Sequence, residues 1–137
     1  MGGVTPRKKI CKVLVVEDDS DIRELLGDLF AAEGYHFTLA ANAAEMRAAL
    51  ASDPDYDILI ADVRLPGESG LILAEEAAAR GLPVILTSGD GTHFDKIETS
   101  GRRHLVKPYR LPALLALIDE TLQATKANCE RERRAAG

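Results

Sequence analysis

The sequence predicts an α/β fold in which helices cover both faces of a parallel sheet. Short apolar runs alternate five times with helix-forming segments along the 137 residues, which is typical of parallel strands joined by crossover helices. Each run is continuous rather than alternating in polarity, as expected of strands that are buried on both sides. A chain of this length forms one domain with a substantial core.

The first elements follow a lead, residues 1–9, that carries glycine, proline and three consecutive basic residues and that we expect to be disordered. Val13–Val16 is the first buried strand. Asp19 or Ser20 can cap the helix that follows, and Gly34 ends it in the usual C-terminal position. That helix has apolar residues at the spacing of one buried face, namely Ile22, Leu25, Leu26, Leu29 and Phe30.

The later elements repeat this alternation, and each is bounded by a cap, a glycine or a proline. We expect strands at His36–Ala40, Ile58–Asp62, Val84–Leu86 and Leu105–Val106, and helices at about Ala43–Ala51 after Asn42, at Leu71–Ala79 before Gly81, and from Pro112 onward through Leu114, Leu115, Ile118 and Leu122. The glycine-rich segment Gly89–Gly101 lacks an amphipathic pattern, so the fourth helix should be short or irregular.

Composition limits the classes of partner. We expect a folded domain over residues 10–124 and a charged tail, 125–137, that frays into solvent. Seventeen basic against twenty-two acidic residues give a net charge of −5, which argues against duplex DNA as a partner. No apolar run approaches the length of a membrane span or the core of a signal peptide. Cys11 and Cys129 lack metal-ligand spacing, which favours two reduced thiols in a cytoplasmic protein.

Polar residues follow four of the predicted strands. Glu17 and Asp18 end the first strand, Asp62 the third, Thr87 the fourth and Lys107 the fifth. Ligands of open parallel sheets bind beyond the carboxyl ends of the strands, where the strand order reverses. Right-handed crossovers leave few arrangements. If the order is 2-1-3-4-5, the first and third strands are neighbours at that point, and these five side chains converge.

The converging groups suit phosphoryl chemistry. Three carboxylates in one crevice repel each other unless a cation intervenes, and oxygen ligands in a solvated site suit Mg²⁺. Lys107 and Thr87 can hold phosphoryl oxygens, and Asp62 is a natural nucleophile because carboxylates can form acyl phosphates. Taken singly, each residue has a simpler explanation, such as a helix-terminal acid, a cap or a surface lysine. Their coincidence at four strand ends favours a functional site.

The combined motif resembles the receiver domains of two-component response regulators over about Lys12 to Leu122. The likeness is carried by Glu17-Asp18-Asp19, by Asp62 with Leu65-Pro66-Gly67-x-Ser69-Gly70, by Thr87-Ser88 and by Lys107-Pro108. It implies a flavodoxin-like (CheY-like) sheet in the order 2-1-3-4-5. It also implies that Asp62 accepts a phosphoryl group from a sensor histidine kinase or a histidine phosphotransfer protein. Such a domain promotes its own phosphorylation and hydrolysis and turns over no separate substrate.

The resemblance also implies roles for the other residues. Mg²⁺ would be held by carboxylates and one backbone carbonyl, supplied by Glu17 (directly or through water), Asp18, Asp62 and Arg64. Thr87 and Lys107 would hold the phosphoryl group. Because no second domain is expected after Leu122, we expect a stand-alone receiver that acts by protein contact, or as a phosphate shuttle or sink.

Two departures bear on how the signal leaves the site. Many receivers carry Tyr or Phe three residues before the lysine, where this chain has His104. The glycine-rich segment from Thr87 to Lys107, with Thr-Ser-Gly at its start and Lys-Pro-Tyr at its end, is similar to that of receivers attached to hybrid sensor kinases. The low apolar content of Gly89–Gly101 suggests a loop that becomes ordered on phosphorylation. Ile22 and Leu26, at the start of the first helix, are candidates for docking a helix pair of a kinase. The alternative is that both lie in the core, which is favoured for Leu26.

Other functions fit the residues less well. A phosphatase of the haloacid dehalogenase type would carry its nucleophile on the first strand in an Asp-x-Asp pattern, which this chain lacks. A binding module that keeps the fold without phosphorylation is disfavoured by the intact Asp62, Thr87 and Lys107. A dinucleotide-binding domain would need a glycine-rich turn after the first strand, and none is present.

Overall fold

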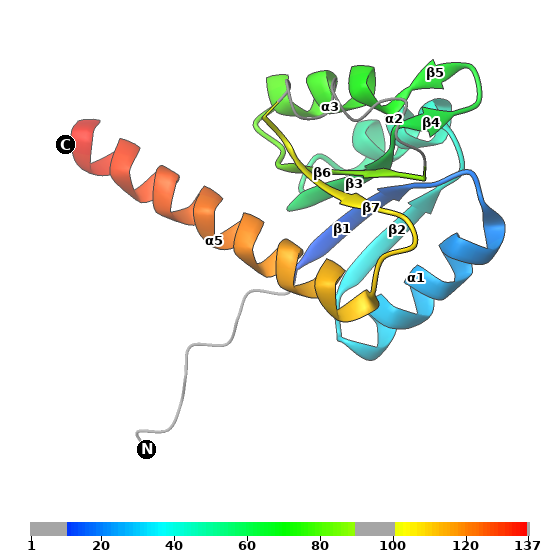
Figure 1. Cartoon of the computed structure of the whole chain (residues 1–137). Helices are drawn as coiled ribbons and strands as arrows, with labels where there is room; N and C mark the ends of the chain where they lie inside the picture. Colours follow the sequence, from blue (N-terminus) through cyan, green and yellow to red (C-terminus); the bar gives the residue numbers. More distant parts are fainter. Residues whose placement is uncertain (1–10, 90–100, 137) are drawn as a thin grey trace.

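The computed structural model describes residues 11–89 and 101–136, with side chains as far as Thr125. Five strands form one parallel sheet in the order β2-β1-β3-β6-β7, and helices lie on both sides of it (Figure 1). The strands are β1 (Lys12–Val16), β2 (His36–Ala40), β3 (Ile58–Asp62), β6 (Val84–Ser88) and β7 (Arg103–Val106). Counted along the chain, these strands have the predicted order 2-1-3-4-5, so the predicted fold class is confirmed.

Four helices are described: α1 (Ser20–Ala32), α2 (Ala43–Ser52), α3 (Gly70–Ala79) and α5 (Leu111–Ala136). The predicted caps form, because Asp19 Oδ1 accepts the N–H groups of Asp21 and Ile22 and Asn42 Oδ1 accepts that of Glu45. Gly34 and Gly81 follow the ends of α1 and α3 with φ of 78°, the left-handed conformation that ends helices. The expected fourth helix falls on residues 90–100, outside the described residues.

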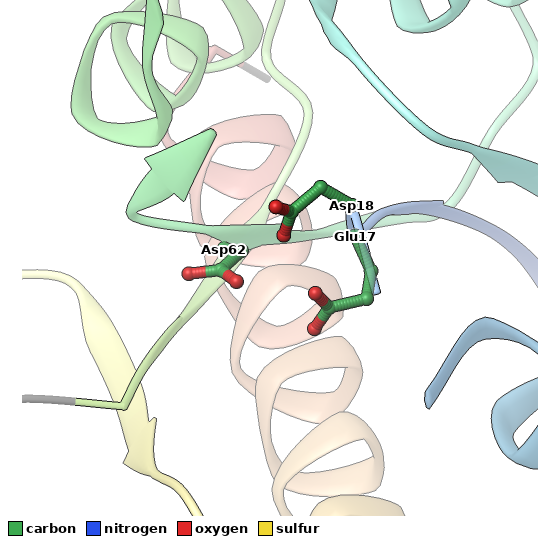
Figure 2. A group of neighbouring side chains, drawn as sticks. All are labelled: Glu17, Asp18 and Asp62. Atoms are coloured by element: carbon green, nitrogen blue, oxygen red, sulfur yellow. The ribbon is translucent and has the colours of Figure 1, made fainter. Parts of the chain in front are cut away.

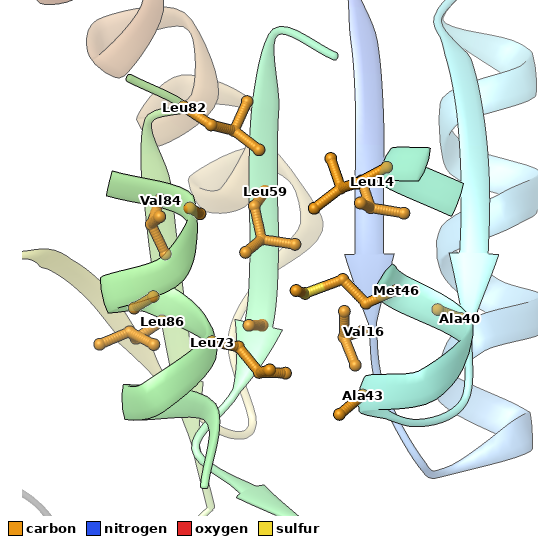
Figure 3. Packing of buried hydrophobic residues seen from close by; sticks show 14 of the residues in the cluster. Leu14, Val16, Ala40, Ala43, Met46, Leu59, Leu73, Leu82, Val84 and Leu86 are labelled. Carbon is orange, nitrogen blue, oxygen red and sulfur yellow. The ribbon is translucent and has the colours of Figure 1, made fainter. Parts of the chain in front are cut away.

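Two apolar layers hold the helices to the sheet. On one face, residues of α2 and α3 such as Met46 and Leu73 pack on alternate residues of the strands, including Leu59 (Figure 3). On the other face, α1 and α5 contribute residues such as Phe30 and Ile118. The strands are therefore buried on both sides, as their continuous apolar runs predicted. Leu26 is 1% exposed, so this docking candidate belongs to the core.

Helix α5 differs most from expectation. It continues to Ala136, where the sequence analysis placed a fraying tail from residue 125. At about 1.5 Å per residue its 26 residues span about 39 Å, so it extends well past the sheet (Figure 1). The reason is composition: residues 126–136 contain neither glycine nor proline and are rich in alanine, arginine and glutamate, which favour helix. No described helix is long and apolar enough to span a membrane.

A short hairpin that was predicted only as a turn follows β3. Its strands, β4 (Arg64–Leu65) and β5 (Glu68–Ser69), pair antiparallel. Pro66 and Gly67 form the turn between them, and Gly67 has a φ of 79°, which suits Pro-Gly at the centre of a type II turn. The hairpin therefore begins two residues after Asp62.

Cys11 is a buried free thiol. Burial, helped by the nearby Asp57 carboxylate, raises its pKa to about 11. The thiol therefore stays protonated near neutral pH and is a poor nucleophile or metal ligand. The side chain of Cys129 lies outside the described residues.

Candidate functional site

The register of the sheet aligns the polar residues. In the sheet, Asp62 of β3 pairs with Thr87 of β6, and Thr87 pairs with Leu105 of β7. The last pair between β1 and β3 joins Val16 to Ala61, so the next residues, Glu17 and Asp62, come side by side. Residues two apart in a strand point to the same side. Leu105 packs on the layer of α1 and α5, and Lys107 lies two residues further on. The carboxyl ends of β1, β3, β6 and β7 therefore present their polar side chains on one side of the sheet.

The turn between β1 and α1 fixes Glu17. Its N–H donates to Ala40 O at 3.0 Å, and its carbonyl accepts a hydrogen bond from Arg23 Nη1 at 2.7 Å. Its side-chain Oε2 accepts the N–H of Asp19 at 3.1 Å. Glu17 is 2% exposed, whereas Asp18 is exposed and stands beside it (Figure 2). Burial is the main cause that raises the pKa of Glu17.

The chain after β3 fixes Asp62, which is 5% exposed. Its Oδ1 accepts the N–H of Arg64 at 3.0 Å. Val63 N–H donates to Thr87 O, and Gly70 N–H donates to Val63 O, both at 2.9 Å. This last bond brings the start of α3 onto the backbone of Asp62, so closely that a Cβ on Gly70 would lie 2.0 Å from the Asp62 carbonyl oxygen.

Lys107 joins the two buried acids. Its Nζ lies 2.6 Å from Glu17 Oε1 and 2.8 Å from Asp62 Oδ2. Burial alone would lower the pKa of Lys107, but the hydrogen bonds to Asp62 and Glu17 raise it overall. The lysine therefore remains charged and offsets part of the repulsion between the two carboxylates.

The three carboxylates suit a divalent cation. One oxygen each from Glu17, Asp18 and Asp62 can be chosen so that all lie within 4.8 Å of one another (Figure 2). Three carboxylates against the single ammonium of Lys107 leave two negative charges, which a divalent ion would neutralise. Oxygen donors of this kind fit Mg²⁺. Both oxygens of Glu17 and both oxygens of Asp62 accept hydrogen bonds within the domain, whereas Asp18 is exposed to solvent.

Asp18 and Asp62 open into a crevice of about 510 Å³. Its lining comes from five segments of chain: Asp18, Asp62, the hairpin residues Arg64, Leu65 and Pro66, Gly89, and Lys107. Thr87 is 2% exposed and stands next to Asp62 in the sheet. His104, on β7, pairs in register with Leu86 of β6 and is partly buried. Asp62 and Lys107 both line this crevice, and their direct contact at 2.8 Å means that the lysine must move before a phosphoryl group can lie between them.

The structure thus brings together all the acids and the lysine that the sequence analysis selected. It adds two residues that were not given roles. Arg23 lies one turn into α1 and holds the carbonyl of Glu17; an arginine four residues after a helix cap is too common to serve as a signal. Gly70 was part of the motif, but the need for glycine there follows from a backbone contact with Asp62, which is visible only in three dimensions.

Comparison with known proteins gives consistent matches. The family model described as "Response regulator receiver domain" matches residues 13–119. The chain is 36% identical over 105 residues to the transcriptional regulatory protein AruR of Pseudomonas aeruginosa, covering 71% of this chain and 43% of that protein. It is 35% identical over 101 residues to the aerobic respiration control protein ArcA of Escherichia coli, covering 71% and 42%. The chain spans less than half the length of these relatives.

Solved structures agree with the fold. A response regulator receiver domain protein from Clostridium thermocellum superposes with a TM-score of 0.77 at 25% identity, covering 86% of this chain and 98% of that one. For a receiver protein from Pseudomonas putida the TM-score is 0.73 at 30% identity, with coverage of 82% and 98%. The receiver domain of the hybrid histidine kinase CckA gives 0.67 at 29% identity, with 81% and 98%, and supports the predicted likeness to hybrid-kinase receivers.

Proposed function

Because this chain belongs to the response regulator receiver domain family, we propose that it is a two-component signalling domain that accepts a phosphoryl group on Asp62 in a Mg²⁺-dependent reaction. Receivers of this family are signalling modules that take phosphate from histidine kinases and bind Mg²⁺ in an acidic pocket. The observation that carries the assignment to Asp62 is that its carboxylate lines the crevice together with Asp18 and lies 2.8 Å from Lys107 Nζ.

The reaction uses the groups in the crevice as follows. A carboxylate oxygen of Asp62 attacks phosphorus, a new O–P bond forms, and the P–N bond to the donor histidine breaks with its electron pair on the imidazole, which takes a proton from water. Lys107 moves from the carboxylate to a phosphoryl oxygen. Thr87, the neighbour of Asp62 in β6, offers its hydroxyl to another. Hydrolysis by water returns the free carboxylate and phosphate.

Mg²⁺ would be held by Asp18, Asp62 and the carbonyl of Arg64, with Glu17 acting through water. When bound, it neutralises charge on the acids and on the phosphoryl oxygens. The arrangement supports this role because the acids hold two negative charges in excess of Lys107. The chain's own part is to orient Asp62 through the N–H of Arg64 and to keep Lys107 charged.

The partner follows from the same chemistry. We infer a histidine kinase or histidine phosphotransfer protein in the cytoplasm as the donor, and a protein rather than DNA as the receiver of the signal, since the net charge is −5. Leu25, 51% exposed, and the partly buried Ile22 are apolar residues in the first two turns of α1, the helix that follows Glu17 and Asp18. A phosphate sink in a phosphorelay would use the same site. A switching role for His104 stays a prediction, and the predicted ordering of Gly89–Gly101 falls on residues of which 90–100 lie outside the described part of the chain.

The function is tested with acetyl phosphate as a small donor and intact mass as the readout. The wild-type chain should gain the mass of one phosphoryl group with Mg²⁺ and very little with EDTA. Asp18→Asn, which removes one charge from the metal site at an exposed position, should slow the gain by roughly ten-fold or more, the range for a lost metal partner. A wild-type chain that stays unmodified in Mg²⁺ would favour the phosphorylation-independent binding module.

A further inference from the structure

Arg47, on the exposed side of α2, lies between two acids on different elements. Its Nη1 donates to Glu68 Oε1 at 3.2 Å and its Nη2 to Glu68 Oε2. Its Nε donates to Glu76 Oε1 at 3.1 Å and its Nη2 to Glu76 Oε2 at 2.5 Å. Glu68 belongs to β5 of the hairpin and Glu76 to α3. One guanidinium therefore joins α2 to both β5 and α3, which follow each other directly along the chain.

The hairpin leads directly to the crevice. Glu68 pairs with Leu65, and Leu65 follows Arg64 in β4. Arg64 donates its N–H to Asp62 Oδ1 at 3.0 Å, and β4 forms part of the crevice wall. A shift of β5 relative to α2 would therefore move the backbone of Arg64 and, through that hydrogen bond, the carboxylate of Asp62.

The hairpin depends on its contacts with the rest of the domain. Its two strands have two residues each, and a two-stranded ribbon of that length is not stable alone. Leu65 is partly buried against the layer of α2 and α3, and Gly70 anchors the far end at Val63 O. The ion pair between Arg47 and Glu68 ties the hairpin to α2, and it is bidentate, the form that fixes orientation best.

The ion pairs contribute little to global stability. The side chains of Arg47, Glu68 and Glu76 are 44%, 27% and 40% exposed. Pairs this exposed are screened by water and salt and add little to the free energy of folding. A guanidinium that binds two carboxylates from two elements restricts the relative positions of those elements. This local restriction does not require the ion pairs to add to the free energy of folding.

We propose that Arg47 is a positioning residue, which holds the β4–β5 hairpin against α2 through Glu68 and thereby sets the place of Arg64 and Asp62 in the metal and phosphoryl site. The expected effect on cation binding rests on the proposed function. The expected effect on the hairpin rests only on the contacts between Arg47 and Glu68. Removing the Arg47 guanidinium loosens the hairpin. The site must then be ordered each time it binds a cation, and this entropic cost lowers the affinity for the cation.

Three variants separate this role from a general surface effect. Arg47→Met keeps the apolar stem but not the charge; Glu68→Gln weakens the pair to the hairpin; Glu76→Gln weakens the pair to α3 and is the matched control. Binding of Mn²⁺, as a spectroscopic substitute for Mg²⁺, is measured by electron paramagnetic resonance. Amide hydrogen exchange at Arg64 is measured in metal-free buffer.

Arg47→Met and Glu68→Gln should each weaken Mn²⁺ binding by roughly three- to ten-fold, somewhat below the loss of a direct outer-shell partner, and should speed exchange at Arg64. Glu76→Gln should change neither quantity, and all three should melt at about the wild-type temperature. Unchanged exchange and affinity in Arg47→Met would overturn the proposal, as would equal effects of Glu68→Gln and Glu76→Gln. If wild type binds no Mn²⁺ while Arg47→Met still speeds exchange, the metal site fails and the positioning role stands.

Discussion

Gly70→Ala should lower the free energy of unfolding by about 3 kcal/mol, at the upper end for overpacking because backbone, not side chain, must move. The added Cβ would stand 2.0 Å from the carbonyl oxygen of Asp62 and 2.9 Å from the Cα of Val63. Relief requires a shift of α3 away from β3 or a shift of Asp62 itself. Urea unfolding followed by far-ultraviolet circular dichroism measures the loss, since the chain has no tryptophan.

Gly67→Ala is the control at the turn of the same hairpin. Its Cβ would meet nothing within 4 Å, but its φ of 79° disfavours a side chain, so we expect a loss of about 1 kcal/mol from backbone strain alone. A Gly70→Ala loss no larger than that of Gly67→Ala would show that the start of α3 yields easily and does not hold Asp62 in place.

Lys107→Met should also destabilise the fold, by about 2–4 kcal/mol in the absence of divalent ions. Removing one partner of a buried ion pair leaves uncompensated charge, which costs about 3–5 kcal/mol in full burial, and the open crevice reduces this. Glu17 and Asp62 have side chains 3% and 7% exposed, so their repulsion is poorly screened. Millimolar Mg²⁺ should restore part of the loss, because it brings positive charge to the same acids.

Lys12→Met provides the matched comparison. Lys12 pairs with Asp53 at the other end of the sheet, where both side chains are about 30% exposed (29% and 34%). We expect a loss of about 1 kcal/mol or less there, with no response to Mg²⁺. Equal losses in the two lysine variants, or a Lys107→Met deficit that Mg²⁺ leaves unchanged, would contradict a charge-balancing role for Lys107.

The convergence of the site was predictable because it depends on periodicity. Continuous apolar runs identify strands buried on both faces, parallel strands end at one edge of the sheet, and so Glu17, Asp62 and Thr87 had to be neighbours once the strand order was assigned. The structure confirms that order. The caps at Asp19 and Asn42 were predictable for the same reason, since a cap depends on residues within one turn of helix.

What the sequence did not reveal depends on contacts between distant segments. Lys107 and Glu17 are 90 positions apart, and their hydrogen bond depends on how far the lysine side chain reaches into the crevice. The β4–β5 hairpin has strands too short for a pattern, and its tie to Arg47 crosses 21 positions. The end of α5 was misplaced because a charged, alanine-rich segment without glycine or proline is equally compatible with a tail and with a helix.

The most direct measurement is the identity of the phosphorylated residue. The chain is incubated with acetyl phosphate and Mg²⁺, the acyl phosphate is reduced with borohydride to an alcohol, and the modified peptide is sequenced by mass spectrometry. Asp62 should be the modified residue, hydroxylamine should prevent the label, and Asp62→Asn should carry none. Modification of Glu17 or Asp18, a label that survives hydroxylamine, or normal labelling of Asp62→Asn would contradict phosphoryl transfer to Asp62.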